Sequence, residues 1–366
     1  MIPAGRGAAA APIRVLVADA SRLVRREVGR LLTERGDTEI VASVGDGVAA
    51  IDARLACDPD VVVIDLALPK LDGLEAIRWM MGRRPVPIVV FGCAGSRLAA
   101  EALGLGVIEI LAKPQGPVSL DLEPLAEQLS GAVRRASRIR VVRNALGSFV
   151  DAGPAGRNAA AVADEERGTP GPARPVPVVA LTASTGGPVA LQRVLAELPS
   201  TLPAALVVCQ HLPPGFTADL AGLLRRVSRL RVEEARDGEM LGAGIVHVAP
   251  GGRDLAIVGR CLRLSESPLR ACGPSADLLF GSLASSAGES AVAVVLTGMG
   301  EDGARGARSI RERGGTVIAQ DEASSVVYGM PAAAMRLGGV NLQLPLGEIG
   351  PTVARLVTRL AEGRAA

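Results

Sequence analysis

The chain has 366 residues, of which 48% are hydrophobic and 21% charged, so it is long enough for two or three globular domains with sizeable cores. Aromatic residues make up only 2%, and the cores must therefore be built from Val, Leu, Ile and Ala. The 40 basic and 38 acidic residues nearly balance, which argues against nucleic acid or a membrane surface as the main partner.

The five cysteines form no CxxC pair and no zinc-binding spacing, and their odd number is typical of free thiols in a reducing cytosol. The first 12 residues lack the apolar segment of a signal peptide. No stretch of 18 apolar residues occurs anywhere. We therefore expect a cytoplasmic protein without membrane insertion.

The first part of the chain alternates between strand and helix patterns, from residue 13 to about residue 143. Residues 21–32 have helical spacing, and residues 122–142 indicate a helix with several arginines near its end. Between the helical segments, β-branched and other apolar runs predict strands at residues 13–17, 61–64, 88–91 and 107–111. Continuous runs of this kind indicate a parallel, doubly wound α/β sheet of the flavodoxin-like type at residues 13–140.

A linker is predicted at residues 141–177, since nine of the 27 residues from 151 to 177 are Gly or Pro. A second α/β domain with a mainly parallel sheet follows at 178–364. Its predicted strands are 178–181, 205–209, 291–297 and 316–319, with a hairpin at 256–264. Its predicted helices are 188–197, 216–226, 275–286, 302–312 and 349–360. Ligands of such folds gather at the carboxyl ends of the strands.

Three glycine-rich turns in this second domain each follow an apolar run and carry one reactive side chain. Ser184 precedes Gly186-Gly187, His211 follows residues 205–209, and Asp302 lies in the segment 298–303. A hydroxyl, an imidazole and a carboxylate are the groups of a serine-nucleophile hydrolase. The chain order Ser, His, Asp differs from the three familiar orders, so spacing alone neither confirms nor excludes a triad.

Each of these residues also has an ordinary structural interpretation. Ser184 before a helix is a common N-cap, and Asp302 in a glycine turn is a common helix cap. His211 is one of only two histidines. The other, His247, lies among Ile245, Val246 and Val248 in the segment 231–248, where strand and turn pieces are predicted, and is the weaker candidate for a general base. If the site is catalytic, Thr185, Met299 and Gly300 are candidates for backbone donors to an oxyanion.

Taken together, the segments around these residues resemble the chemotaxis protein-glutamate methylesterase family. The resemblance covers nearly all of residues 178–360. It rests on Ala183-Ser184-Thr185-Gly186-Gly187-Pro188, Gln210-His211-Leu212-Pro213, Phe216-Thr217, Ala249-Pro250-Gly251-Gly252, Pro274-Ser275-Ala276-Asp277-Leu278-Leu279-Phe280, the segment 296–303, Ala319-Gln320-Asp321-Glu322 and Tyr328-Gly329-Met330-Pro331.

This resemblance implies hydrolysis of glutamate γ-methyl esters on the cytoplasmic helices of chemoreceptors, and deamidation of certain receptor glutamines. It implies that Ser184 is the nucleophile, His211 the base and Asp302 the residue that orients His211, with no cofactor for catalysis. The histidine usual before the Pro-Ser-x-Asp segment is replaced near Cys272-Gly273, and another is replaced by Arg253 or Asp254. These replacements affect the expected substrate choice more than the expected chemistry.

Residues 13 to about 140 resemble a response-regulator receiver domain, which in the family covers the esterase until it is phosphorylated by a histidine kinase. The resemblance implies that Asp65 is the phospho-acceptor, that Lys113 is the receiver lysine, and that Asp19 and Asp65 hold Mg²⁺. Ala20 replaces the usual second acid, and Gly92 replaces the usual hydroxyl residue. We therefore expect weak metal binding and poor phosphorylation of Asp65. The alternative is that Asp65 is a buried carboxylate paired with Lys113.

Two other functions stay open from the sequence. One is a signalling module that binds partners and retains a vestigial hydrolase. The other is a regulator of a pathway other than chemotaxis, whose esterase acts on another receptor-like protein. Esterase turnover that is lost in Ser184→Ala argues against the first. Turnover on methylated receptor fragments argues against the second.

Overall fold

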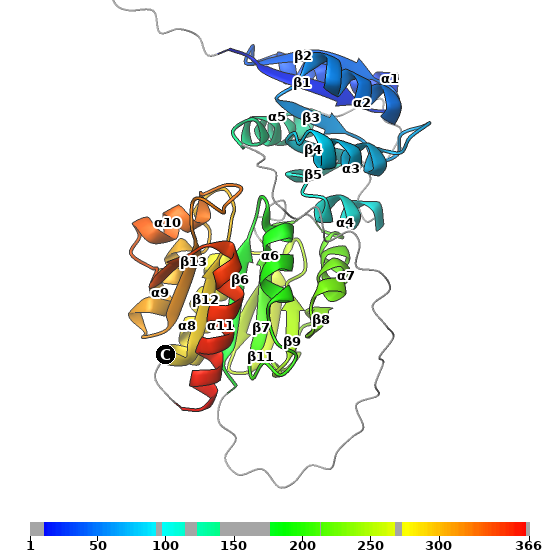
Figure 1. Ribbon diagram of the computed structural model, residues 1–366. Helices are drawn as coiled ribbons and strands as arrows, with labels where there is room; N and C mark the ends of the chain where they lie inside the picture. The colour runs from blue at the N-terminus through cyan, green and yellow to red at the C-terminus, as the bar shows by residue number, and fades with distance from the viewer. Residues whose placement is uncertain are drawn as a thin grey trace, which may run out of the picture.

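The computed structural model describes residues 11–92, 97–113, 123–139, 176–212, 214–267 and 273–363. These residues form two α/β domains, each built on a parallel sheet, as predicted (Figure 1). Nearly all of the predicted linker lies outside the described residues, as do Cys93 and Cys272. No helix in the described part of the chain combines the length and the apolar character that crossing a membrane would require.

The first domain is a five-stranded sheet in the order β2-β1-β3-β4-β5. Its strands are β1 (Ile13–Ala18), β2 (Thr38–Val44), β3 (Val61–Ile64), β4 (Ile88–Gly92) and β5 (Glu109–Ala112). Its helices are α1 (Arg22–Thr33), α2 (Gly47–Cys57), α3 (Gly73–Arg83), α4 (Arg97–Gly104) and α5 (Glu123–Ser137). Helices α1 and α5 cover one face of the sheet, and the other three helices cover the opposite face.

Strand β3 shows why a continuous apolar run belongs in the middle of such a sheet. All four of its residues are buried, and alternate side chains point to opposite faces. Val62 and Ile64 enter the core beneath α3, while Val61 and Val63 enter the core beneath α1 and α5. Strand β2 lies at the sheet edge and is only partly buried. Its mixed sequence did not identify it as a strand.

The second domain has a seven-stranded parallel sheet in the order β14-β13-β12-β6-β7-β9-β8 and a separate antiparallel hairpin, β10-β11. The strands are β6 (Val178–Ala183), β7 (Ala205–Gln210), β8 (Arg231–Glu234), β9 (Ile245–Val248), β10 (Arg253–Val258), β11 (Cys261–Glu266), β12 (Ala291–Val295), β13 (Thr316–Gln320) and β14 (Leu342–Leu344). The helices are α6 (Gly187–Ala196), α7 (Thr217–Val227), α8 (Ala276–Ala287), α9 (Ala304–Glu312), α10 (Met330–Arg336) and α11 (Leu346–Ala361), with a short 3₁₀ turn at Gly288–Ser290.

Two hydrophobic cores lie on the two faces of this second sheet. Helices α6, α7 and α11 pack on one face, with α11 beside α6 in Figure 1. Helices α8, α9 and α10 and the β10-β11 hairpin pack on the other. Burial on both faces explains why strands β6, β7 and β12 consist almost entirely of apolar residues.

The two domains share a continuous buried cluster. Helix α4 of the first domain packs against α7 and α6 of the second domain. In Figure 1 it lies directly above these two helices. A Cβ added at Gly104 would lie 3.2 Å from Leu223 Cδ1, and one added at Gly106 would lie 3.9 Å from Val189 Cγ2. In addition, Val326 and Val327 of the second domain pack against the core beneath α1 and α5.

Candidate active site

Ser184 lies in a tight turn between β6 and α6. Its backbone N–H donates to Thr297 O at 3.0 Å, and its carbonyl accepts from the N–H of Gly187 at 2.8 Å. Gly186 has a φ of 77°, and a Cβ there would lie 2.6 Å from Val326 Cβ. Only glycine meets both the conformational and the steric requirement. The glycines after Ser184 therefore allow the chain to turn sharply and leave the serine at the strand end.

His211 follows the neighbouring strand at the same height as Ser184. Ala183 of β6 and Gln210 of β7 are register partners, and the His211 N–H donates to Ala183 O at 3.1 Å. The parallel pairing therefore brings the two candidates to the same edge of the sheet. In the part of the chain that the structure describes, no hydrogen bond joins the Ser184 hydroxyl to the His211 ring, and such bonds often form only when substrate is bound.

Asp302 lies against the imidazole of His211. Its Oδ2 is 2.8 Å from His211 Nε2, although 91 residues separate the two in the chain. Backbone N–H groups at the start of α8 hold the carboxylate: Ala276 donates to Oδ2 at 2.7 Å and Asp277 to Oδ1 at 2.9 Å. The positive end of the α8 dipole faces the same group. The carboxylate is thus fixed in place from two sides.

These contacts keep Asp302 ionised. Burial opposes ionisation, but hydrogen bonds from His211 and from the N–H groups of Ala276 and Asp277 outweigh it, so the pKa of Asp302 is below its ordinary value. An ionised carboxylate only accepts, and His211 Nε2 must therefore carry the hydrogen in this contact. The Nδ1 atom is then left as the acceptor that a general base requires.

The turn that supplies these donors is itself anchored by a residue from the hairpin. Ser275 caps α8, with its Oγ accepting from the Leu278 N–H, and its own N–H donates to Asp254 Oδ1 at 2.9 Å. Asp254 is one of the two positions, with Arg253, at which the sequence analysis placed a departure from the family pattern. In this structure its carboxylate positions the α8 N-terminus that binds Asp302.

The predicted oxyanion donors lie near this centre. Thr185 is buried and Met299 is half exposed. Among the described residues, the backbone N–H groups of Thr185, Met299 and Gly300 have no protein acceptor. Gly298 packs directly against the serine, since a Cβ there would lie 2.8 Å from Ser184 Cβ. Unpaired N–H groups beside a hydroxyl are suited to binding a negatively charged oxygen.

Three polar residues that the sequence analysis did not assign hold the site together. Gln210 Nε2 donates to Ser184 O at 2.9 Å, and Thr297 Oγ1 donates to Thr185 O at 3.0 Å. Gln320 Oε1 accepts from the Thr297 N–H at 2.8 Å. All three are buried and stand at or just beyond the end of an apolar strand. A buried polar residue at such a strand end is the sequence signal that would have identified them.

In the first domain, Asp19, Asp65 and Lys113 form one cluster at the carboxyl ends of β1, β3 and β5. Lys113 Nζ lies 2.6 Å from Asp19 Oδ2 and also bonds to Asp65 Oδ2. Burial opposes the lysine charge, but the two carboxylates outweigh it and raise the pKa of Lys113. The predicted pairing of Asp65 with Lys113 is therefore present.

The donor set of this cluster fits a weakly held Mg²⁺ ion. Asp19 and Asp65 offer carboxylate oxygens, the ligands that Mg²⁺ prefers, while Ala20 offers no side-chain oxygen and Lys113 competes for both acids. At Gly92, a Cβ would lie 2.9 Å from Asp65 Oδ1, so any side chain there would crowd the acid.

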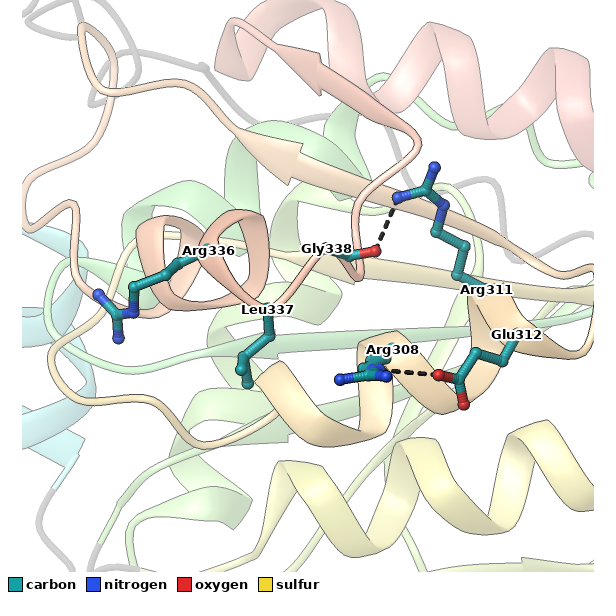
Figure 2. Close-up of a pocket in the computed structure, with 6 residues that line it drawn as sticks. All are labelled: Arg308, Arg311, Glu312, Arg336, Leu337 and Gly338. Carbon is teal, nitrogen blue, oxygen red and sulfur yellow. Dashed lines mark hydrogen bonds and ion pairs between the residues drawn. The ribbon is translucent and has the colours of Figure 1, made fainter.

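A separate hollow of about 550 Å³ lies between α9 and α10 (Figure 2). Its lining residues are Arg308, Arg311, Glu312, Arg336, Leu337 and Gly338. Arg308 Nε is 2.7 Å from Glu312 Oε1, and Arg311 Nη1 donates to Gly338 O at 2.7 Å. Because two of its guanidinium groups are already paired and none of the candidate catalytic residues line it, we assign this hollow no part in catalysis.

The fold and the site define a two-domain protein. A five-stranded α/β domain with an Asp-Asp-Lys cluster is joined to a second α/β domain with the side chains of a serine hydrolase beyond its strand ends. A family model described as CheB methylesterase matches residues 179–353, and one described as response regulator receiver domain matches residues 15–122. The family resemblance drawn from the sequence is confirmed by these matches.

Curated relatives match along nearly the whole chain. A protein-glutamate methylesterase/protein-glutamine glutaminase 1 of Myxococcus xanthus is 40% identical and covers 95% of this chain and 98% of the relative. A protein of Anaeromyxobacter dehalogenans with the same name and number 2 is 41% identical, with the same coverage. The crystal structure of the Thermotoga maritima CheB methylesterase catalytic domain is 38% identical, covering 49% of this chain and 98% of that one, with a TM-score of 0.48. The chain belongs to the CheB methylesterase family and carries a receiver domain at its N-terminus.

Proposed function

We propose that this protein hydrolyses glutamate γ-methyl esters on the cytoplasmic helices of chemoreceptors and deamidates specific glutamines there. The observation that carries the proposal is the 2.8 Å contact between His211 and Asp302 beside the Ser184 turn. The names of the relatives support both activities, since each is called a methylesterase and a glutaminase.

In this reaction Ser184 attacks the ester carbonyl while His211 Nδ1 takes the hydroxyl proton. Asp302 holds the imidazole in place and stabilises its protonated form. The N–H groups of Thr185, Met299 and Gly300 then stabilise the oxyanion of the tetrahedral intermediate. His211 returns the proton to the leaving methanol, or to ammonia when the substrate is a glutamine. Water hydrolyses the acyl-enzyme by the same steps and releases the glutamate.

The receiver domain gates this site. Val326 supports such coupling because it borders the Ser184 turn at Gly186 and also packs against the receiver core. The contact of α4 with α6 and α7 is a second place where the receiver meets the esterase domain. Phosphorylation at Asp65, with a histidine kinase as donor, shifts the population from states in which the receiver covers the active site to states in which the site is open to substrate.

A bound Mg²⁺ ion would neutralise charge on the phosphoryl group, and Asp19 and Asp65 would hold it. Lys113 contacts both acids and remains charged. Because Ala20 supplies no ligand, phosphorylation of Asp65 is slow in this chain.

The test is steady-state release of methanol from methylated receptor fragments. Ser184→Ala lowers kcat by about 10⁶-fold, as loss of a nucleophile does in other serine hydrolases. Ser309→Ala is the matched control, because the Ser309 hydroxyl only bonds to Arg305 O on the exposed face of α9. Equal turnover in wild type and Ser184→Ala would mean that the protein acts as a binding module or uses another nucleophile.

A further inference from the structure

A second cluster of ionisable side chains lies at the edge of the esterase sheet, away from Ser184. Glu233 in β8 and His247 in β9 are register partners in neighbouring parallel strands, so their side chains share one face. Glu239 comes from the turn that follows β8. One nitrogen or carboxylate oxygen from each of the three lies within 4.8 Å of the others. The two strands concerned are labelled at the edge of the second domain in Figure 1.

The turn that carries Glu239 is held firmly by the hairpin beside it. The Gly238 N–H donates to Leu262 O at 2.9 Å, and the Leu262 N–H donates back to Glu239 O at 2.8 Å. Asp237 Oδ1 accepts from the Leu264 N–H at 2.9 Å. The carboxylate of Glu239 is therefore presented to His247 from a rigid backbone, which reduces the entropy lost on binding a ligand.

His247 is the unusual member of the cluster. Its side chain is 0% exposed, yet neither ring nitrogen has a hydrogen-bond partner. Buried polar groups are nearly always paired, so the lack of a partner for this histidine needs an explanation, and a bound ligand would provide one. Its Nδ1 lies 3.5 Å from Glu239 Oε2, which is too long for a strong hydrogen bond. Around a tetrahedral ion with bonds of about 2.0 to 2.1 Å, neighbouring ligand atoms lie about 3.3 to 3.4 Å apart.

The charges around the cluster suit a cation. Two carboxylates and one fully buried imidazole meet in this cluster, so its formal charge with a neutral ring is negative. Arg231 Nη2 donates to Glu233 Oε2 at 2.8 Å, and the Arg236 backbone N–H donates to Glu239 Oε2 at 3.1 Å. Glu239 Oε2, which lies 3.5 Å from His247 Nδ1, accepts the Arg236 bond with one lone pair and keeps another for a further ligand. Both glutamates are only partly buried, which leaves an entry path.

We propose that Glu233, Glu239 and His247 bind one divalent transition-metal ion of the zinc class, with water in the fourth position. One imidazole and two carboxylates form a donor set that such ions accept, and no thiolate takes part. The ion would tie β8, the following turn and β9 together. Strand β9 leads directly into Ala249-Pro250-Gly251-Gly252, so the bound ion would also restrict the motion of the loop after the strand.

The full-length protein is stripped with a chelator and titrated with Zn²⁺ alone, by calorimetry and by thermal unfolding. One equivalent binds, and the unfolding temperature rises. His247→Gln and Glu239→Gln each weaken binding at least tenfold. His211→Gln is the matched control, because it removes the only other histidine and leaves binding unchanged. Two variants are used so that one remains informative if the other does not fold.

Titration with Co²⁺ separates this site from zinc binding by free cysteines such as Cys261. The proposed site holds the ion through nitrogen and oxygen, so the Co²⁺ spectrum lacks a thiolate charge-transfer band. The proposal is overturned if no stoichiometric ion binds, if the band appears, or if His247→Gln binds as wild type does. In those cases the cluster holds no metal ion.

Discussion

Gly104 at the end of α4 faces Leu223 of α7 so closely that an added Cβ would lie 3.2 Å from Leu223 Cδ1. This contact joins the receiver to the esterase domain through a glycine, and a larger residue there would be in tight contact with Leu223. Leu103 and Leu223 are nearly buried on the two sides of the contact. If the receiver covers the active site, weakening this contact releases the esterase.

Gly104→Glu is therefore expected to raise the methylesterase activity of the unphosphorylated protein by about tenfold. This corresponds to destabilising the state in which the receiver covers the active site by roughly 1.4 kcal/mol relative to the uncovered state. The new Cβ would lie 3.2 Å from Leu223 Cδ1, so the added side chain would push against this leucine and bring a charge to the edge of an apolar contact. The control is Gly82→Glu in α3, where a Cβ meets nothing within 4 Å. Equal activity in the two variants would count against gating through α4.

Asp302→Asn is expected to lower kcat by about 10⁴-fold with little change in KM, because the amide no longer holds the required imidazole tautomer. Methanol release measures the effect. Glu301→Gln is the control, since the Glu301 side chain is 80% exposed and its nearest cation, an Arg336 nitrogen, is 4.0 Å away. A loss of similar size in both variants would indicate a general disturbance of the loop.

Acid should remove the stability that Asp302 contributes. Its pKa is lowered in the folded protein, so the contribution is fully present above the unfolded value, near 3.9, and is lost as the pH falls through the folded value. Denaturant unfolding of wild type and Asp302→Asn at pH values from 7 to 3 tests this. The advantage of wild type should shrink below about pH 4. A constant difference across that range contradicts the assignment.

Gly298→Ala is expected to displace the nucleophile. The new methyl group would lie 2.4 Å from Met330 Sδ and 2.8 Å from Ser184 Cβ. The methionine can move, but Ser184 Cβ is fixed to the backbone. We expect a loss of about 1–3 kcal/mol in unfolding free energy from overpacking, and a lower kcat.

The control for this change is Gly281→Ala in α8, where the added methyl meets nothing within 4 Å. It should gain about 0.5–1 kcal/mol, because alanine favours a helix over glycine. Chemical denaturation and kinetics on the same samples compare the two. Full activity in Gly298→Ala would show that the turn accommodates the methyl group without displacing Ser184.

Ala20→Asp is expected to strengthen Mg²⁺ binding and to speed Mg²⁺-dependent labelling of Asp65 by a small phosphoryl donor. The new carboxylate would add a ligand to a cluster in which Lys113 now contacts both acids. Asp65→Asn is the control and should not be labelled. Rapid labelling of the wild type would refute the expectation of an impaired receiver.

Much of the fold was predictable from local patterns. Continuous runs at residues 61–64 and 178–181 predicted buried strands, and the structure places β3 and β6 in the middle of parallel sheets. The hairpin at β10-β11 also followed from its sequence. The partly exposed edge strand β2, the three-residue strand β14 and helix α10 were not predicted. Short or half-exposed elements carry few apolar residues, so their pattern is weak.

For the site, the sequence by itself determined which side chains stand at strand ends: Ser184, His211 and Asp302 each follow an apolar run. Which of them touch was decided only by the tertiary structure. The pairing of β6 with β7 sets Ser184 beside His211, and the packing of α8 supplies the N–H groups that hold Asp302. The complete burial of His247 and the contact of Gly104 with Leu223 likewise depend on distant segments. Strand and turn preferences act between neighbours in the chain, whereas these contacts arise when separate segments bury their surfaces together.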